Sequence, residues 1–476
     1  MKLSSIPKSF FTQMILYIFF PTIIFAQWAP KVNISPNAMQ AGLNESMGSC
    51  IGASGDTIHV VWTDKFTPTR AAIYYRRSHD TGLTWDNVMN LTDTNGNAWN
   101  PAIAVNGQNI HVVWREIDTV PPMHRSSWYK HSVDGGNTWT LKIMLDSVIA
   151  DWPAVTVSGS YVYAANDITV DTTGNTEVFF LRSTDNGNTW SQHTRLTYAP
   201  NRSEDEAIYA QGSHVFMSWN DKRTGLFKIY VKHSSDYGVN WDPDTAVMQT
   251  QYYGTMVNIN GANIDVVAAG TPAGHYQIHL VQSPDTGATW GTNMDLTNDT
   301  AVTYYYPHMT RDGADLHITY EKAGAGAQYL HSGDGGATWD PPFTLGNAGI
   351  TTFSAYTGCV LHVIMPDSGK ISYRRNPTGN AGHCPVNISD QNENKINISV
   401  YPNPFSSQTT IEITSPEIIE NTELKVYDMV GREVMKTYFG NNNSITISRN
   451  NLKGGIYIYK VFLKDREIGV GKMMVK

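Results

Sequence analysis

The chain has 476 residues, of which 11% are aromatic and 16% are charged, and its formal net charge at pH 7 is −8. This length allows one large domain together with a smaller one. The negative net charge and the absence of any run of lysines and arginines argue against a nucleic-acid-binding surface.

Residues 1–26 have the pattern of a secretory signal peptide. Lys2 and Lys8 accompany an apolar run from Phe10 to Phe25, and a small residue stands before Gln27. Because the run is short and is interrupted by Pro21, it is a poor membrane span. We expect export and a mature chain that begins near Gln27. We also expect no transmembrane span in that chain and a final location outside the cell or on its outer surface.

The pattern S-x-D-x-G-x-[TN]-W occurs six times, and its closing tryptophans lie 49 to 54 residues apart. Its aspartates are Asp80, Asp134, Asp185, Asp236, Asp285 and Asp334. The Asp can accept hydrogen bonds from amides that follow it, the Gly permits a positive φ, and the Trp offers apolar surface to the sheet. Because a catalytic site is normally built once, six equal corners predict a structural role for these aspartates.

A second repeat has seven copies, each a Gly followed by an alternating apolar strand such as Ile58–Asp64 or Ile110–Glu116. One short strand precedes the Gly, a third strand ends at the S-x-D-x-G-x-[TN]-W pattern, and a fourth follows the Trp. Four short strands in about 50 residues predict one blade of a β-propeller.

Two kinds of polar residue recur in the second repeat, and recurrence favours a structural role for both. We expect the acids at the end of the strand to cap loop amides. We interpret the histidines, which share one position, as packing residues and not as metal ligands. The acids are Asp64, Glu116, Asp167, Asp221 and Asp367, and the histidines are His59, His111, His317 and His362.

The seventh copy has a third strand, Lys370–Arg375, but no clear fourth strand. Trp28–Ser35 resembles the fourth-strand pattern, and its pairing with the seventh copy would close the ring and cover an exposed edge. Cys384–Ser389 has a similar pattern and is a rival for the same place. We therefore predict an all-β chain with a propeller over residues 27–385. We expect seven blades closed by the N-terminal strand, with six blades as the alternative.

The chain contains three cysteines, Cys50, Cys359 and Cys384, and an odd number excludes a complete disulfide framework. One bridge with a spare thiol and three buried thiols both remain open; a bridge would lie near the closure of the propeller. The spacing of the cysteines fits no zinc site. We expect neither a metal nor a cofactor.

Residues 386–398 are polar and predict a linker, and residues 399–476 predict a second module. Its apolar strands alternate with Gly-containing turns, as in Leu424–Lys436 and Leu452–Val461. About seven such strands predict a small β-sandwich.

Both modules resemble known families. The S-x-D-x-G-x-[TN]-W pattern resembles the Asp box of the bacterial neuraminidase repeat, which occurs in sialidases and in many other β-propellers. This resemblance implies that the boxes join the third and fourth strands of each blade, on the face opposite the ligand site. YPNPF, VYD-x-x-G-x-x-V and L-x-x-G-x-Y in residues 399–476 resemble the C-terminal sorting domain of type IX secretion. That resemblance implies handling by the type IX machinery, usually followed by cleavage.

Sialidases carry an arginine just before a Pro at the start of their first blade, as part of an arginine triad. They also use an Asp acid/base and a Tyr–Glu nucleophile pair. Here the corresponding segment, Leu43–Cys50, contains neither the arginine nor the Pro. We therefore predict a glycan-binding propeller without the sialidase arginine motif, with glycans or glycoproteins as partners. A divergent exo-sialidase or other glycoside hydrolase is the alternative, and a protein-interaction or adhesion scaffold is a further one.

The resemblance places the ligand face at the loops that lead into strand one and those between strands two and three. A single site needs residues that only one blade has, and sugar rings need flat apolar surfaces beside polar groups. The ligand-binding candidates are Trp99, Trp152, Asp205, Glu206, Tyr253, Tyr306 and His308; the alternative is that the aromatic ones only pack the inner strands. If the chain is an enzyme, the catalytic candidates are Glu206, Tyr306, Arg115, Arg202 and Arg223.

Overall fold

The computed structural model describes sixteen segments of the chain. They are residues 28–36, 40–43, 48–67, 69–92, 96–118, 124–147, 150–249, 251–271, 274–346, 351–377, 397–414, 422–429, 431–439, 444–449, 452–463 and 466–476. The chain divides into two compact units, Met1–Cys384 and Pro385–Lys476. The predicted signal peptide, the rival closing strand and most of the predicted linker lie outside the described residues. Within the described part of the chain, no helix has the length and apolar character needed to cross a membrane.

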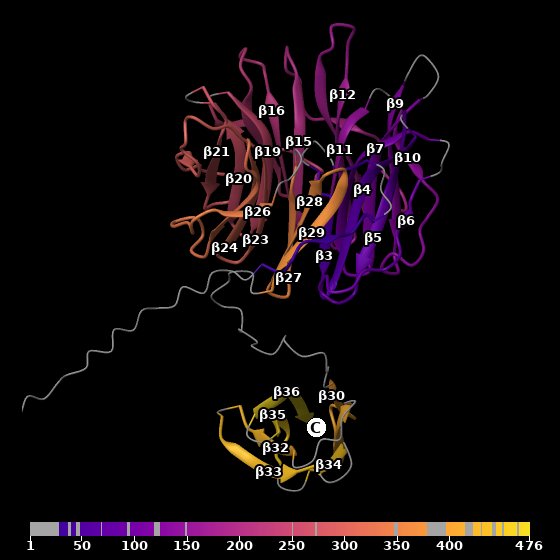
Figure 1. Ribbon diagram of the computed structural model, residues 1–476, viewed down its shortest axis with the longest axis vertical. Helices are drawn as coiled ribbons and strands as arrows, with labels where there is room; N and C mark the ends of the chain where they lie inside the picture. The colour runs from indigo at the N-terminus through magenta and orange to yellow at the C-terminus, as the bar shows by residue number, and fades with distance from the viewer. Residues whose placement is uncertain are drawn as a thin grey trace, which may run out of the picture. The chain divides into compact units, whose positions relative to one another are not determined.

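The first unit is an all-β propeller, and its described residues form seven antiparallel sheets (Figure 1). We call these sheets blades one to seven. In blade one, β2 (Ala41–Gly42) and β3 (Ile51–Ser54) both pair with β4 (Thr57–Thr67), which is followed by β5 (Arg70–Ser78) and β6 (Met89–Asn90). In blade seven, β27 (Phe353–Thr357), β28 (Val360–Asp367) and β29 (Lys370–Asn376) are joined by β1 (Val32–Asn33).

Blades two to six each contain four strands in chain order. Blade two has β7 (Ala98–Asn106), β8 (Asn109–Ile117), β9 (Arg125–Ser132) and β10 (Ile143–Asp146). Blade three has β11 (Ala150–Ser158), β12 (Tyr161–Thr169), β13 (Thr176–Ser183) and β14 (Thr194–Arg195). Blade four has β15 (Ser203–Gln211), β16 (His214–Asp221), β17 (Lys228–Ser234) and β18 (Thr245–Met248). Blade five has β19 (Tyr252–Asn260), β20 (Asn263–Gly270), β21 (Gln277–Ser283) and β22 (Met294–Asp295). Blade six has β23 (Tyr304–Asp312), β24 (Asp315–Lys322), β25 (Gly326–Ser332) and β26 (Phe343–Gly346).

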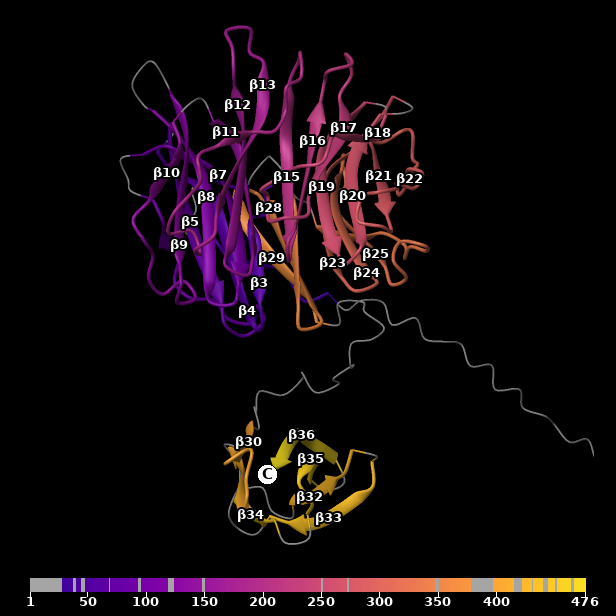
Figure 2. The same ribbon diagram turned by 180° about the vertical axis from the view of Figure 1, so that it is seen from behind.

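The blades form a closed ring. The innermost strand of each blade contacts that of the next, and β27 of blade seven contacts β3 of blade one. Both ribbon views show β28 and β29 beside β3 and β4 (Figures 1 and 2). β1 pairs with β29, with Val32 opposite Tyr373, as residues 28–35 predicted. The Ala29 amide also donates to the Arg375 carbonyl at 2.8 Å. The N-terminal segment thereby covers the outer edge of blade seven.

The Asp boxes share one set of hydrogen bonds, as in the box of blade two. The Ser132 hydroxyl donates to Asp134 at 2.8 Å, and the Thr138 amide and hydroxyl donate to the same carboxylate at 2.9 and 2.6 Å. Equivalent bonds occur in the other five boxes. The bonds from Thr138 and Ser132 lower the pKa of Asp134 to about 2. The Asp therefore supplies acceptors that the turn itself lacks.

The box tryptophans pack against the neighbouring blade. Trp190 of blade three meets Tyr129 of β9 edge-on, with ring centroids 4.9 Å apart. Trp85 of blade one meets Tyr373 of β29 in the same way, also at 4.9 Å. The boxes therefore fasten each of these blades to the one before it and join the first blade to the last.

The recurring histidines contact the same tyrosines. His111 Nδ1 lies 2.7 Å from the Tyr129 hydroxyl, and equivalent contacts join His59 to Tyr75, His317 to Tyr329 and His362 to Tyr373. Burial lowers the pKa of His111 to about 3, so this ring is neutral at physiological pH. These contacts are those of packing residues inside the blades.

Two cysteines lie in the described residues. Cys359 is disulfide-bonded, and its partner lies outside those residues. Cys50 is a buried thiol whose Sγ donates to the Pro101 carbonyl at 3.2 Å. The sequence allowed either one bridge with a spare thiol or three buried thiols, and the structure has the bridge.

The second unit is a two-sheet β-sandwich, visible in Figure 2. One sheet contains β30 (Asn397–Tyr401), β31 (Gln408–Thr414) and β34 (Ser444–Ser448). The other contains β33 (Glu433–Tyr438), β32 (Thr422–Tyr427), β35 (Gly455–Leu463) and β36 (Arg466–Val475). Ile411, Leu424, Val426, Val461 and Met473 are fully buried between the sheets. The first strand begins two residues inside the predicted linker.

Candidate functional site

Five inner strands share a β-bulge near their first residues. The register shifts between Trp99 and Ala102 in β7, and equivalent shifts occur in β11, β15, β19 and β23. At each bulge one residue has a positive φ, between 47° and 58°. These residues, which we call the bulge ring, are Asn100, Trp152, Asp205, Gly254 and Tyr306. Positive φ is uncommon for residues other than glycine, and bulges often lie next to active sites, where they redirect side chains.

The bulge ring and the Asp boxes lie at opposite ends of the strands. The Asn186 amide of a box donates to the Ser160 carbonyl, in the turn between β11 and β12, at 2.9 Å. The bulge at Trp152 lies at the other end of β11. We call the end that carries the bulge ring the ligand end, because the family resemblance implies a ligand face opposite the boxes.

The predicted ligand-binding residues gather at this repeated position. Trp152, Asp205 and Tyr306 belong to the bulge ring, and Trp99 and Tyr253 directly precede it. In the sequence these residues stand out because they are not repeated from blade to blade. The structure shows that their position is repeated in five blades and that only the residue type changes.

A cluster of carboxyl groups lies between blades three and four at the ligand end. This acid cluster consists of Asp151, Asp167, Glu204, Asp205 and Glu206. Asp167 and Glu206 are buried, and neither Glu206 oxygen has a hydrogen-bond partner among the described residues; the same is true of Asp167 Oδ1. Burial and the nearby Asp167 carboxyl hold the pKa of Glu206 well above its usual range. Burial and Asp205 raise the pKa of Glu204 to about 7.

The prediction that Asp167 repeats the acids of the other blades was wrong. Asp167 pairs with Asp151 on the neighbouring strand. In blade two the equivalent register position is that of Arg115, which pairs with Trp99. In the structure Asp167 of β12 stands one residue away from the position that Glu116 has in β8. The Asp167 side chain therefore faces the other side of the sheet. Asp221 does cap a loop, because it accepts the Arg223 amide at 2.9 Å.

The arginine candidates are already paired with carboxylates. Arg115 forms an ion pair with Asp151 and lies over the Trp152 ring at 5.3 Å. Arg202 pairs with Glu204 at 2.5 Å, and Arg223 pairs at 2.6 Å with Asp221 of its own blade. Each of these arginines is therefore ion-paired with a carboxylate of the protein itself.

The Tyr–Glu pair that a sialidase mechanism requires is not formed by Glu206. Within the described residues no tyrosine hydroxyl, that of Tyr306 included, donates to either of its carboxyl oxygens. The expectation of a sialidase-like pair at Glu206 is therefore not met by this geometry.

A row of aromatic rings crosses the ligand end from blade four to blade six. This aromatic row consists of Phe227, Tyr253, Tyr276, Tyr305 and Tyr306, with successive ring centroids 5.0, 5.6, 5.8 and 6.0 Å apart. The four tyrosines are half-buried, so each keeps part of its ring accessible. Tyr276 was not predicted, because it lies in a loop directly before β21 and outside any repeated pattern.

A further carboxyl group lies beside the aromatic row and was also missed. Glu321 of β24 lies opposite Tyr305, at the register position of Arg115 and Asp167. Its Oε2 atom is buried without a hydrogen-bond partner in the described residues, and burial raises the pKa of Glu321 to about 7. The only signal in the sequence is that this position changes its residue type from blade to blade.

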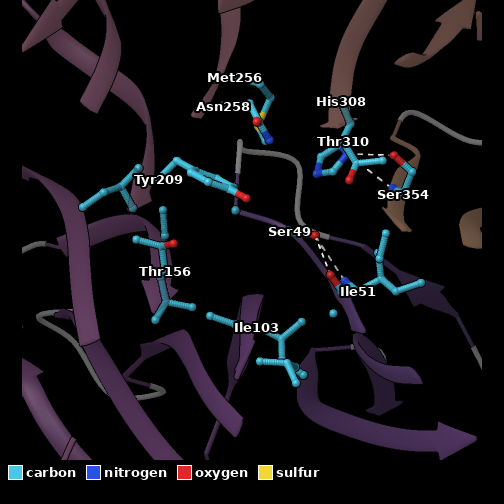
Figure 3. A pocket seen from close by; sticks show the side chains of 18 of the residues that line it. Ser49, Ile51, Ile103, Thr156, Tyr209, Met256, Asn258, His308, Thr310 and Ser354 are labelled. Atoms are coloured by element: carbon cyan, nitrogen blue, oxygen red, sulfur yellow. Dashed lines mark hydrogen bonds between the residues drawn. The ribbon is translucent and has the colours of Figure 1, made fainter. Parts of the chain in front are cut away.

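His308 lines a separate cavity on the axis of the ring. The cavity has a volume of about 240 Å³ and is lined by residues of all seven inner strands. Figure 3 shows Tyr209, Asn258 and His308 around it, with dashed lines from His308 to Ser354. His308 Nδ1 accepts the Ser354 amide at 3.3 Å, and burial lowers the pKa of His308 to about 3. His308 is therefore a neutral cavity residue and is not part of the aromatic row.

The described residues contain no group of three or more His, Cys, Asp or Glu side chains that could hold a metal ion.

Residues 27–318, more than half of the chain, match the family described as BNR repeat-like domain. The chain belongs to this family. Residues 399–476 match the secretion system C-terminal sorting domain, which indicates export to the outer surface or beyond it. Both family resemblances drawn from the sequence are thereby confirmed.

Several solved structures are similar to this BNR repeat protein. Trypanosoma rangeli sialidase is 11% identical, with 93% of this chain and 89% of that chain covered and a TM-score of 0.44. The GH93 α-L-arabinofuranosidase of Fusarium graminearum is 14% identical, with 58% and 91% covered and a TM-score of 0.41. Penicillium chrysogenum α-L-arabinanase is 13% identical, with 60% and 94% covered and a TM-score of 0.43. No curated protein matches the chain.

Proposed function

We propose that this BNR repeat protein is exported by its signal peptide and the type IX machinery and binds glycans at the ligand end. The observation that carries the proposal is the aromatic row with Glu321 beside it, because the Glu321 Oε2 atom is buried without a hydrogen-bond partner in the described residues. Sugar rings have the complementary surface, with apolar C–H faces and hydroxyl groups around the edge.

The two kinds of group would act on different parts of a sugar ring. Tyr253, Tyr276 and Tyr305 are half-buried and in ring contact, so little side-chain freedom remains to be lost when a sugar stacks on them. Glu321 lies beside Tyr305 and can bond a hydroxyl at the edge of the stacked ring. A buried polar atom without a partner costs about 1–3 kcal/mol, and a sugar hydroxyl would remove that cost.

A glycan array followed by isothermal titration tests the proposal. Tyr276→Ala and Tyr306→Ala should each weaken binding of an array-selected glycan by about 1–3 kcal/mol, the value of one ring's contact area. Tyr237→Ala is the matched control, because Tyr237 belongs to an Asp box at the opposite end. Folded variants that bind as tightly as the original chain, or the absence of any bound glycan, would contradict the proposal.

A glycoside hydrolase is the second candidate, favoured by one observation. Glu204 and Glu321 both have a pKa of about 7, which suits a general acid near neutral pH. A panel of fluorogenic glycosides, sialosides included, tests this candidate. Turnover that is lost in Glu321→Gln or Glu204→Gln would support it, and no turnover of any member would leave glycan binding as the function.

A further inference from the structure

We propose that the ligand end takes neutral sugars or amino sugars and rejects sugars that carry a carboxylate. This inference rests on the proposed glycan binding and concerns the class of glycan. It departs from what sialidases require, which is a cluster of arginines that clamps the carboxylate of the sugar.

Three arginines at the ligand end of blades two to four are ion-paired within the protein. Arg115 and Arg125 both form ion pairs with Asp151, and Arg202 pairs with Glu204. Recognition of a carboxylate depends on a guanidinium fork that is free to make two parallel hydrogen bonds. In this site a ligand carboxylate would have to displace Asp151 or Glu204 from its partner.

Asp167, Glu206 and Glu321 at the ligand end each have a buried carboxyl oxygen without a hydrogen-bond partner in the described residues. Asp167 and Glu206 are buried between blades three and four, and Glu321 lies beside the aromatic row. When ionised these groups repel an anionic sugar, and the repulsion is strong because little water separates the charges. When protonated they donate hydrogen bonds to the hydroxyl or acetamido oxygens of a neutral sugar. An amino sugar is attracted to the ionised form.

Two lysines at this end do not replace the missing fork. Lys222 lies over the Phe227 ring at 5.4 Å and close enough to Glu204 to lower that residue's pKa. Lys322 lies over the Tyr304 ring at 5.6 Å. An ammonium group is a point charge without the planar geometry that fixes a carboxylate.

The test is an array of neutral, amino-, sialylated and uronate-containing glycans, probed with the purified chain. Isothermal titration then compares each bound neutral glycan with its sialylated counterpart. The bound glycans should be neutral or amino sugars, and the sialylated counterparts should bind at least about tenfold more weakly, which corresponds to about 1.4 kcal/mol of like-charge repulsion. Equal or tighter binding of a sialylated or uronate glycan overturns this inference alone. Absence of any binding overturns the proposed function together with it.

Two further measurements test the role of charge. Glu321→Gln should reduce the preference for the neutral glycan by at least about threefold, whereas Asp56→Asn, which removes a charge from an exposed turn at the Asp-box end, should leave it unchanged. In the unmodified chain, raising the pH from about 6 to about 8 ionises Glu321 and should increase the preference. A preference that is the same at both pH values and in both variants contradicts the inference.

Discussion

Replacing the pair His111 and Tyr129 should make the propeller less sensitive to acid. The pKa of His111 is about 3 in the folded chain, against an ordinary value of 6.5. Because the folded pKa is the lower one, the stability that depends on neutral His111 is complete above pH 6.5 and is lost as the pH falls toward 3. Between pH 7 and pH 5, protonation of the unfolded chain at this residue alone removes about 2 kcal/mol.

Blade three shows which residues can replace this pair. Tyr163 and Phe180 occupy the equivalent positions there, with ring centroids 5.9 Å apart. The double variant His111→Tyr with Tyr129→Phe exchanges both members of the hydrogen-bonded pair together. The new tyrosine takes the place of Tyr163, whose hydroxyl is buried without a hydrogen-bond partner in the described residues of blade three. We expect the free energy of unfolding of this variant to fall by about 2 kcal/mol less than that of the original chain between pH 7 and pH 5.

Urea titrations of the propeller at pH 7, 6 and 5 measure this difference. The control is His124→Tyr, which makes the same exchange at an exposed histidine directly before β9. If the double variant loses as much stability as the original chain between pH 7 and pH 5, His111 is not kept neutral by burial and the reasoning is refuted.

Three more predictions concern the repeat and the sorting domain. Asp134→Ala should lower the urea midpoint, because the turn loses the acceptor for its amides. Glycan binding per folded molecule should stay unchanged, and lost binding in a fully stable variant would speak against a structural role. Gly187→Ala should lower the midpoint more than Gly174→Ala, since both glycines have a positive φ but only at Gly187 would a Cβ overlap the Tyr129 hydroxyl; equal effects would remove the packing argument. Deletion of residues 399–476 should retain the protein within the cell envelope, measured by cell fractionation, and normal surface delivery would contradict the sorting role.

The sequence predicted the fold because the residues that build it are repeated without much change. The Asp box keeps its Ser, Asp and Gly because the same hydrogen bonds recur in the copies. It keeps its Trp because the ring packs on the preceding blade, against a tyrosine for Trp190 and against Phe180 for Trp241. The pairing of β1 with β29 was predictable for a related reason. A sheet edge needs cover, and residues 28–35 had a strand pattern without a blade of their own.

The candidate site was only partly predictable, because its residues differ from blade to blade on a backbone that does not. The bulge ring accepts Trp152, Asp205 and Tyr306 at one position, so no repeated letter marks the bulge. Asp167 and Glu321 share a register position that only strand pairing defines, and a shift of one residue in the alignment placed Asp167 on the wrong face.

The most direct measurement of the central claim is hydrogen–deuterium exchange of the full chain with and without an array-selected glycan. The proposal predicts slower exchange in the first residues of β11, β15, β19 and β23 and in the loop before β21, where the acid cluster and the aromatic row lie. Exchange in the boxes, such as residues 132–139, should not change. Slower exchange confined to the boxes, with none at the bulge ring, would contradict the claim that the ligand end is the binding site.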